Sequence, residues 1–161
     1  THIHLKLSKI PKLNIDYAAL KQELVQLNII TPTAKDISEV VTKIRKQKLP
    51  DPAVIGNAGS FFKNTTISKN KYDLLLKNYP TIPMYPVDDD TVKIPSAWLI
   101  EQAGWKGFRN GDAGCHEKQA LVLVNYGNAS GKDIYELALQ IIASVEHKFG
   151  VRLTMEVNLW N

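Results

Sequence analysis

The stretch KDIYELALQIIASVEHKFG, residues 132–150, carries the strongest helical pattern of the chain. Its apolar residues recur every three or four positions, a spacing that places them on one face of an α-helix. Gly150 follows the last of them, and glycine at this place ends helices because it adopts the left-handed conformation without strain. The pattern predicts a helix over 132–149 whose apolar face consists of Ile134, Leu137, Ala138, Ile141, Ile142, Val145 and Phe149.

Strand patterns lie on both sides of this helix. ALVLVNY (120–126) is apolar and β-branched, which is typical of a buried strand. We expect VRLTMEVNLW (151–160) to close the chain as a strand with Glu156 on its polar face, SFFKN (60–64) to form a short strand, and YPVDDDTVKIP (85–95) to form a turn and a strand. Helices and strands mix without a regular βαβ rhythm, which favours an α+β fold: a small mixed or antiparallel sheet packed with helices.

Four further helices are predicted in the rest of the chain, at roughly 15–27, within 31–48, at 68–79 and at 96–103. Asn14 is in the place of an N-cap for the first of them. Thr33 followed three residues later by Asp36 approximates a capping box for the second. The intervening LPDPAVIGNAG (49–59) contains two prolines that cannot continue a helix, so regular structure is expected to break there.

The chain begins with THIHLKLSK (1–9), in which apolar and polar residues alternate. A period of two predicts a half-buried strand that starts at the first residue. The sequence has neither an initiator methionine nor a signal-peptide pattern. We therefore expect a piece of a longer protein.

Composition narrows the class of protein. With 161 residues, 44% apolar and 22% charged, the chain is large enough for one globular domain. Its single cysteine, Cys115, permits no internal disulfide and fits a reducing compartment, and no stretch approaches the ~20 apolar residues of a membrane-spanning helix. The net charge of +4 suits an anionic ligand, but it is spread along the chain and forms no dense basic run typical of nucleic-acid binding.

The segment GNAGSFFKN (56–64) places small residues directly before a serine. It lacks the G-x-S-x-G elbow of serine hydrolases, and composition alone favours a turn at Gly56 and Gly59. The four histidines have no metal-ligand spacing with Cys115 or with one another. Cys115 and His116 are neighbours, and on a strand they point to opposite faces, so we interpret them as a small packing residue and a surface imidazole rather than as a nucleophile and its base.

Three blocks of the sequence carry a resemblance to a known family. KLPDPAVIGNAGSFFKN (48–64), AWLIEQAGWKGFRNGDAGCHEKQALVLVN (97–125) and KDIYELALQIIASVEHKFGVRLTMEV (132–157) resemble, in order and spacing, the UDP-N-acetylenolpyruvoylglucosamine reductases. These flavoenzymes of bacterial peptidoglycan synthesis use FAD and NADPH to reduce the enolpyruvyl ether of UDP-N-acetylglucosamine enolpyruvate, forming UDP-N-acetylmuramate. The resemblance implies a cytoplasmic protein of cell-wall biogenesis, cell shape and division that is a monomer at full length, with no nucleic-acid or membrane partner.

The resemblance also implies a division of the chain. Residues 1–12 correspond to the end of an upstream flavin-binding region, and residues 13–161 to the substrate-binding C-terminal domain. FAD would be held mainly by the upstream region, so we expect this piece alone to be inactive.

Two residues match the catalytic positions of the family. Ser60 matches the proton donor, and the small residues before it would let backbone and ligand approach closely. Glu156 matches the C-terminal catalytic glutamate, which would meet the developing enolate as a protonated donor or through a bound water.

Five further residues match binding positions. Lys48 corresponds to a lysine near the anionic groups of the substrate, and Asn64 and Gln119 to amides that hydrogen-bond it. Tyr17 resembles the tyrosine of a loop that folds over bound substrate. Arg45 is the weakest match, to a position near a flavin phosphate.

The chain departs from the family pattern at two places, and two other functions stay open. Thr65 stands where the family commonly has proline, and Asn158 where an arginine is typical; we interpret these as altered tuning. A non-catalytic UDP-sugar-binding module would keep the same scaffold. A basic nucleic-acid-binding domain has only the net charge in its favour.

Overall fold

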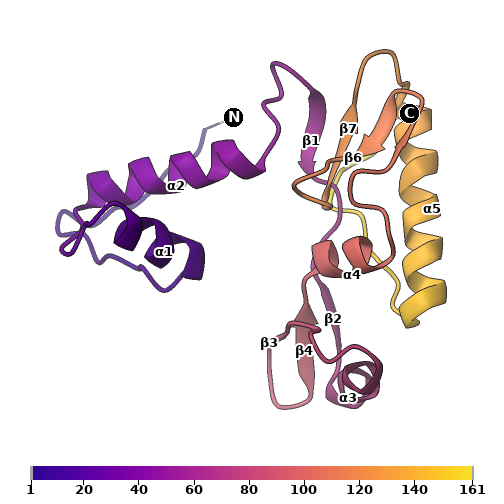
Figure 1. Cartoon of the computed structure of the whole chain (residues 1–161), viewed down its shortest axis with the longest axis horizontal. Helices are drawn as coiled ribbons and strands as arrows, with labels where there is room; N and C mark the ends of the chain where they lie inside the picture. Colours follow the sequence, from indigo (N-terminus) through magenta and orange to yellow (C-terminus); the bar gives the residue numbers. More distant parts are fainter. Residues whose placement is uncertain (1, 161) are drawn as a thin grey trace. The chain divides into compact units, whose positions relative to one another are not determined.

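The computed structural model describes residues 2–160 and divides into two compact units between Lys48 and Leu49 (Figure 1). The elements, in chain order, are α1 (Ala18–Gln26), α2 (Ala34–Lys48), β1 (Gly56–Ser60), β2 (Thr65–Ser68), α3 (Lys69–Asn78), β3 (Tyr85–Pro86), β4 (Thr91–Ile94), α4 (Ser96–Gln102), β5 (Arg109–Asn110), β6 (Ala113–Cys115), β7 (Val122–Asn125) and α5 (Gly131–Phe149). No helix within residues 2–160 is long and apolar enough to cross a membrane.

The first unit is a pair of packed helices, α1 and α2. Their buried contacts are made by Leu20, Leu24, Val40 and Ile44. The capping box before α2 is confirmed: the carboxylate of Asp36 accepts from the Thr33 N–H at 2.8 Å, and the Thr33 hydroxyl accepts from the Asp36 N–H at 3.2 Å. The predicted cap of α1 is wrong, because the Asn14 amide oxygen accepts from Asp16 N–H in a local turn and the helix starts only at Ala18.

The strand predicted at the N-terminus is also wrong over the residues that the structure describes. Residues 2–7 belong to no strand, and Ile3, Leu5 and Leu7 are 85%, 76% and 81% exposed. Alternating apolar residues indicate that a segment suits a sheet, but a strand forms only where another strand pairs with its backbone groups. Thr1 lies outside the described residues.

The second unit has the α+β architecture that was predicted, with its strands divided between two antiparallel sheets rather than joined in one. The larger sheet has the order β1-β7-β6-β5 and the smaller one β2-β4-β3. Helix α5 packs against β6, β7 and α4, and α3 packs against β2 and β4 (Figure 1). The main core is formed by the larger sheet and α5 and is continued by buried residues of α3, β4 and α4.

Helix α5 confirms the pattern from which the fold was predicted. Its buried side chains are Leu137, Ala138, Ile141, Ile142, Val145 and Phe149. A fully buried side chain of this size stabilises the fold by about 1.5–3 kcal/mol. The helix begins with a complete capping box between Ser130 and Asp133 and ends at Gly150, whose φ of 62° is left-handed.

Two strand predictions need correction. The strand near Ser60 covers GNAGS rather than SFFKN, because the backbone of residues 56–60 pairs with β7. The C-terminal segment is not a continuous strand: its one ladder contact within residues 2–160 is the bridge between Phe62 and Met155. Its predicted alternation nevertheless holds, since Val151 and Leu153 are buried while Glu156 is exposed.

We predict that Gly150→Ala destabilises the second unit by about 1–2 kcal/mol, because the left-handed backbone conformation is less favourable by this amount for a residue that has a Cβ. A Cβ there would meet only the end of the flexible Lys71 side chain, 2.6 Å away, so backbone strain dominates. Urea unfolding measures the difference. The matched control is Gly131→Ala in the same helix, where nothing lies within 4 Å of an added Cβ and φ is not positive. Equal midpoints for the two variants would contradict the prediction.

The second prediction concerns acid. Hydrogen bonds from the Ser130 hydroxyl and N–H hold the pKa of the Asp133 carboxyl below its ordinary value of 3.8. A lowered pKa means that the charged form stabilises the fold above the unfolded-state pKa and that this contribution is lost as the pH falls through the folded-state value. Asp133→Asn should therefore unfold more easily than the parent at pH 7, and the difference should shrink in acid. A gap between the two urea midpoints that is independent of pH would count against the assignment.

Candidate active site

Ser60 is the last residue of β1 and is exposed to solvent. Its backbone pairs with Val122 of β7. The next residue, Phe61, is only 5% exposed, and its N–H donates to the carbonyl of Leu121 at 2.7 Å. The serine is therefore attached to a rigid sheet on one side and to the core on the other, while its hydroxyl stays accessible.

Glu156 reaches the same place from the other end of the sequence. Its N–H donates to the carbonyl of Phe61 at 2.8 Å, and Lys63 N–H donates to the carbonyl of Thr154 at 2.9 Å. The C-terminal segment thus runs antiparallel to the residues that follow Ser60. The structure brings the two predicted catalytic residues into neighbouring, hydrogen-bonded segments, and both are exposed.

Gln119 lies in the turn between β6 and β7, half-buried. Its backbone carbonyl accepts from Val122 N–H at 3.0 Å, and its side-chain oxygen lies 3.5 Å from Leu121 N. Because Leu121 in turn accepts from Phe61, Gln119 is linked to the Ser60 region through a single residue. An amide placed here can orient a neutral polar group of a ligand without adding charge.

Asn64 is exposed, and part of its side chain has a structural task. Its amide oxygen accepts from Ser96 N–H at 3.1 Å, at the start of α4, which leaves the NH₂ group to donate elsewhere. The buried Ser96 hydroxyl donates to the carbonyl of Lys63 at 2.6 Å and lies 3.1 Å from the Thr65 hydroxyl. Thr65, the departure from the family pattern, is thereby tied into the turn that holds Asn64.

The three remaining predicted residues belong to the first unit. The Lys48 ammonium lies 5.9 Å from the centre of the Tyr17 ring, a cation–π distance, and both side chains are exposed. Arg45 is exposed on α2, one turn before Lys48. The structure thus brings Tyr17 and Lys48 together.

Cys115 and His116 do not form a reactive pair. The Cys115 thiol is fully buried and donates to the carbonyl of Ala120 at 3.1 Å; burial raises its pKa to about 12, so it stays protonated at neutral pH. The prediction of a surface imidazole is wrong, since His116 is only 8% exposed, its Nδ1 accepts from Lys118 N–H, and burial lowers its pKa. The interpretation failed because the end of β6 is covered on both faces.

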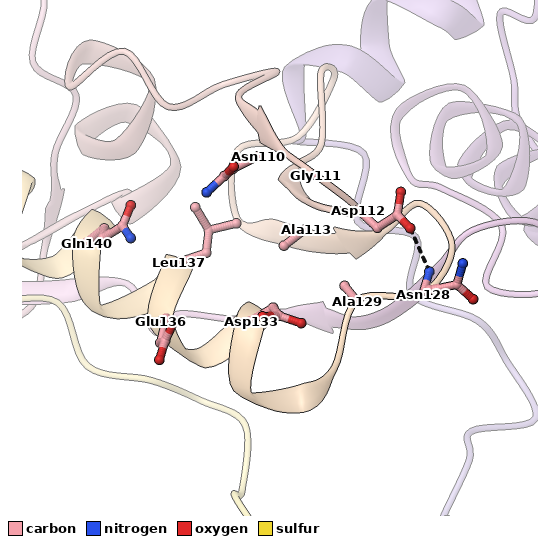
Figure 2. A pocket seen from close by; sticks show the side chains of 10 residues that line it. All are labelled: Asn110, Gly111, Asp112, Ala113, Asn128, Ala129, Asp133, Glu136, Leu137 and Gln140. Carbon is pink, nitrogen blue, oxygen red and sulfur yellow. Dashed lines mark hydrogen bonds between the residues drawn. The ribbon is translucent and has the colours of Figure 1, made fainter.

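Among the cavities lined by residues 2–160, two of about 350 Å³ each lie in the second unit. Figure 2 shows the first, which is lined by three carboxylates that already have partners: Asp112 binds Arg109 and accepts from Asn128 N–H, Asp133 caps α5, and Glu136 lies 3.7 Å from the Lys132 ammonium. The second is mainly apolar, lies beside β1, and includes Asn158, the other departure from the family pattern. Neither is lined by Ser60 or Glu156. Within residues 2–160 no three His, Cys, Asp or Glu side chains are grouped to hold a metal ion.

Neither cavity could be found from the sequence. The residues around the apolar one come from β1, β7, α5 and the C-terminal segment, four pieces that no local motif connects. Two features of the sequence pointed toward the apolar cavity: the departure at Asn158 and the small residues before Ser60, of which Gly56 and Ala58 line it.

Comparisons with known proteins agree with this description. The family pattern described as the C-terminal domain of UDP-N-acetylenolpyruvoylglucosamine reductase matches residues 51–160. The reductase of that name from Pseudomonas savastanoi pv. phaseolicola is 49% identical over 158 residues, which cover 98% of this chain and 47% of the relative. The one from Porphyromonas gingivalis is 49% identical over 156 residues, or 97% of this chain and 46% of the relative.

A solved structure, the UDP-N-acetylenolpyruvylglucosamine reductase of Thermus caldophilus, aligns with a TM-score of 0.45 and 23% identity over 79% of this chain and 34% of that one. The chain spans about half the length of the curated relatives it matches. With the family pattern covering more than half of its residues, the chain belongs to the UDP-N-acetylenolpyruvoylglucosamine reductase family, as its C-terminal domain.

Proposed function

We propose that this chain is the substrate-binding, C-terminal part of a flavin- and NADPH-dependent reductase that converts UDP-N-acetylglucosamine enolpyruvate to UDP-N-acetylmuramate. The observation that carries the proposal is the backbone of Phe61, which joins the Ser60 segment to the Glu156 segment. Family membership supports the choice of reaction. The protein would act in the cytoplasm in cell-wall synthesis, and so in cell shape and division, as a monomer at full length.

The residues of this chain fit a substrate better than a flavin. The exposed residues around Ser60 carry a hydroxyl, an amide, one carboxyl and the Lys63 ammonium, which suit hydrogen bonds to a sugar and a carboxylate. Only Arg45, an exposed cation on α2, is proposed to reach a flavin phosphate. FAD would be held by the part of the relatives that this chain does not span, and residues 1–12 would be the last segment of that part.

The proposed chemistry gives Ser60 one task. A reduced flavin, when bound, would supply the hydride that the vinyl carbon β to the substrate carboxylate must receive. The α-carbon then carries negative charge, shared with the carboxylate as an enolate, and Ser60 donates its hydroxyl proton to that carbon. The product is a lactyl ether, and the serine alkoxide regains a proton from solvent. Placement of the hydroxyl beside the carbon supplies much of the rate advantage.

The other residues bind and orient. Glu156 would stabilise the enolate as a protonated donor or through a bound water, while the NH₂ group of Asn64 and the amide of Gln119 hydrogen-bond the substrate. Lys48, held over the Tyr17 ring, would attract the diphosphate or carboxylate. Each charge-assisted hydrogen bond of this kind contributes about 1.5–3 kcal/mol.

We predict that Ser60→Ala in the full-length protein separates the two half-reactions. NADPH should still bleach the flavin, because hydride transfer to it does not involve the serine. Enolpyruvyl substrate should then re-oxidise the flavin about 10²–10⁴-fold more slowly, the usual contribution of a positioned proton donor. Stopped-flow absorbance of the flavin measures both steps.

The matched control is Ser38→Ala, an exposed serine on α2, which should re-oxidise at the parental rate. Parental re-oxidation in Ser60→Ala would remove that residue from the mechanism. A full-length protein that purifies without flavin would instead support the non-catalytic UDP-sugar-binding module.

A further inference from the structure

Strand β1 contains one residue more than its partner just before Ser60. Gly56 pairs with Asn125 and Asn57 with Val124, but Ser60 pairs with Val122. Ala58 and Gly59 therefore stand opposite the single residue Leu123, which is a β-bulge.

The bulge decides which way Ser60 faces. Side chains alternate along a strand, so a one-residue change of register moves a side chain to the other face. Unbroken pairing would set Ser60 opposite Leu121, on the face where Leu121 and Leu123 pack into the main core. With the bulge, Ser60 lies on the face of Asn57, Val122 and Val124. Both valines are buried, but Ser60, the last residue of β1, is exposed, and the next residue, Phe61, is buried.

The side chain of Asn57 links Gly59 of the bulge to Ile55, the residue that precedes β1. Its amide oxygen accepts from Gly59 N–H at 3.0 Å, and its NH₂ group donates to the carbonyl of Ile55 at 2.9 Å. Gly59 has a φ of 72°, a conformation that glycine adopts without strain. Asparagine suits this place because it has both an acceptor and a donor, whereas an aspartate has no donor.

We infer that Asn57 is a positioning residue for Ser60, an inference that rests on the function proposed above. It touches no reacting atom in this scheme. By fixing the bulge, it fixes the direction and depth of the Ser60 hydroxyl, and a displacement of about 1 Å at a reacting group costs on the order of 10²-fold in rate. Proton transfer, rather than substrate binding, should respond.

The test uses the full-length, flavin-loaded protein with Asn57→Ala, Asn57→Asp and Gly59→Ala. At saturating substrate, Asn57→Ala and Gly59→Ala should slow flavin re-oxidation by about 10–100-fold. The rate at which NADPH bleaches the flavin and the Kd of the substrate should both stay within about threefold of the parent. A variant that merely lost substrate binding would instead show a raised Kd. Asn57→Asp keeps the acceptor for Gly59 and should lie between Asn57→Ala and the parent.

Gly104→Ala is the matched control for Gly59→Ala. It makes the same change at another glycine with a positive φ, 87°, where nothing lies within 4 Å of an added Cβ, but it follows α4, outside β1 and the proposed site. It should re-oxidise at the parental rate. If Gly104→Ala slows re-oxidation as much as Gly59→Ala, the effect belongs to backbone strain in general and the inference fails.

A double substitution separates a positioning role from a merely structural one. If Asn57 acts through the Ser60 hydroxyl, then adding Asn57→Ala to Ser60→Ala should slow re-oxidation no further. The inference would be overturned if the double variant showed the rate reductions of the two single variants multiplied together. It would also be overturned if both Asn57→Ala and Gly59→Ala re-oxidised at the parental rate. If either result occurs while Ser60→Ala re-oxidises slowly, only the inference about Asn57 fails and the proposed function stands. If the single variant Ser60→Ala re-oxidises at the parental rate, the proposed function itself fails.

Discussion

The backbone of Phe61 is the junction on which the candidate site depends. Its N–H is bound to Leu121 at the end of the larger sheet, and its carbonyl is bound to Glu156 in the C-terminal segment. The side chain between these bonds is buried in the core that α5 covers. Ser60 and Glu156, which are far apart in the chain, are therefore both attached to a fixed residue and not to a long, mobile loop. Rigid elements hold reactive groups more accurately than loops do, and here the serine directly precedes the fixed residue.

Features set by neighbouring residues could be predicted from the sequence. The buried face of α5, the Thr33–Asp36 capping box and the left-handed Gly150 each depend on contacts within one turn of a helix. The candidate residues could also be named in advance, because short motifs resemble a known family. Their roles in this chain still rest on that resemblance and on the placement of Ser60 beside the Glu156 segment.

Features set by a distant partner could not be predicted in this way. The alternation in residues 1–9 describes a segment suited to a sheet, but it contains no information on whether a strand lies beside it. β1 forms over GNAGS, a sequence of low strand propensity, because β7 supplies the pairing. The bulge at Ala58–Gly59 is a mismatch between two strands and exists in neither sequence alone. The burial of His116 likewise depends on what packs against β6 from elsewhere.

The exposure of the site places a chemical demand on its surroundings. A serine hydroxyl is a weak acid, and in open water solvent competes with it for any carbanionic carbon. Electrostatic interactions at 4 Å strengthen from about 1 kcal/mol in water to about 4 kcal/mol near a protein surface of lower effective dielectric constant. Ser60, Asn64 and Glu156 are all exposed in this chain. The fold therefore orients these side chains but does not exclude water from them. In the proposed reaction the bound substrate, together with the part of the full-length relatives that this chain does not span, would have to exclude the water. Under the proposed function, this chain would form one wall of the site and set the direction of proton transfer, and the bound substrate would complete the enclosure.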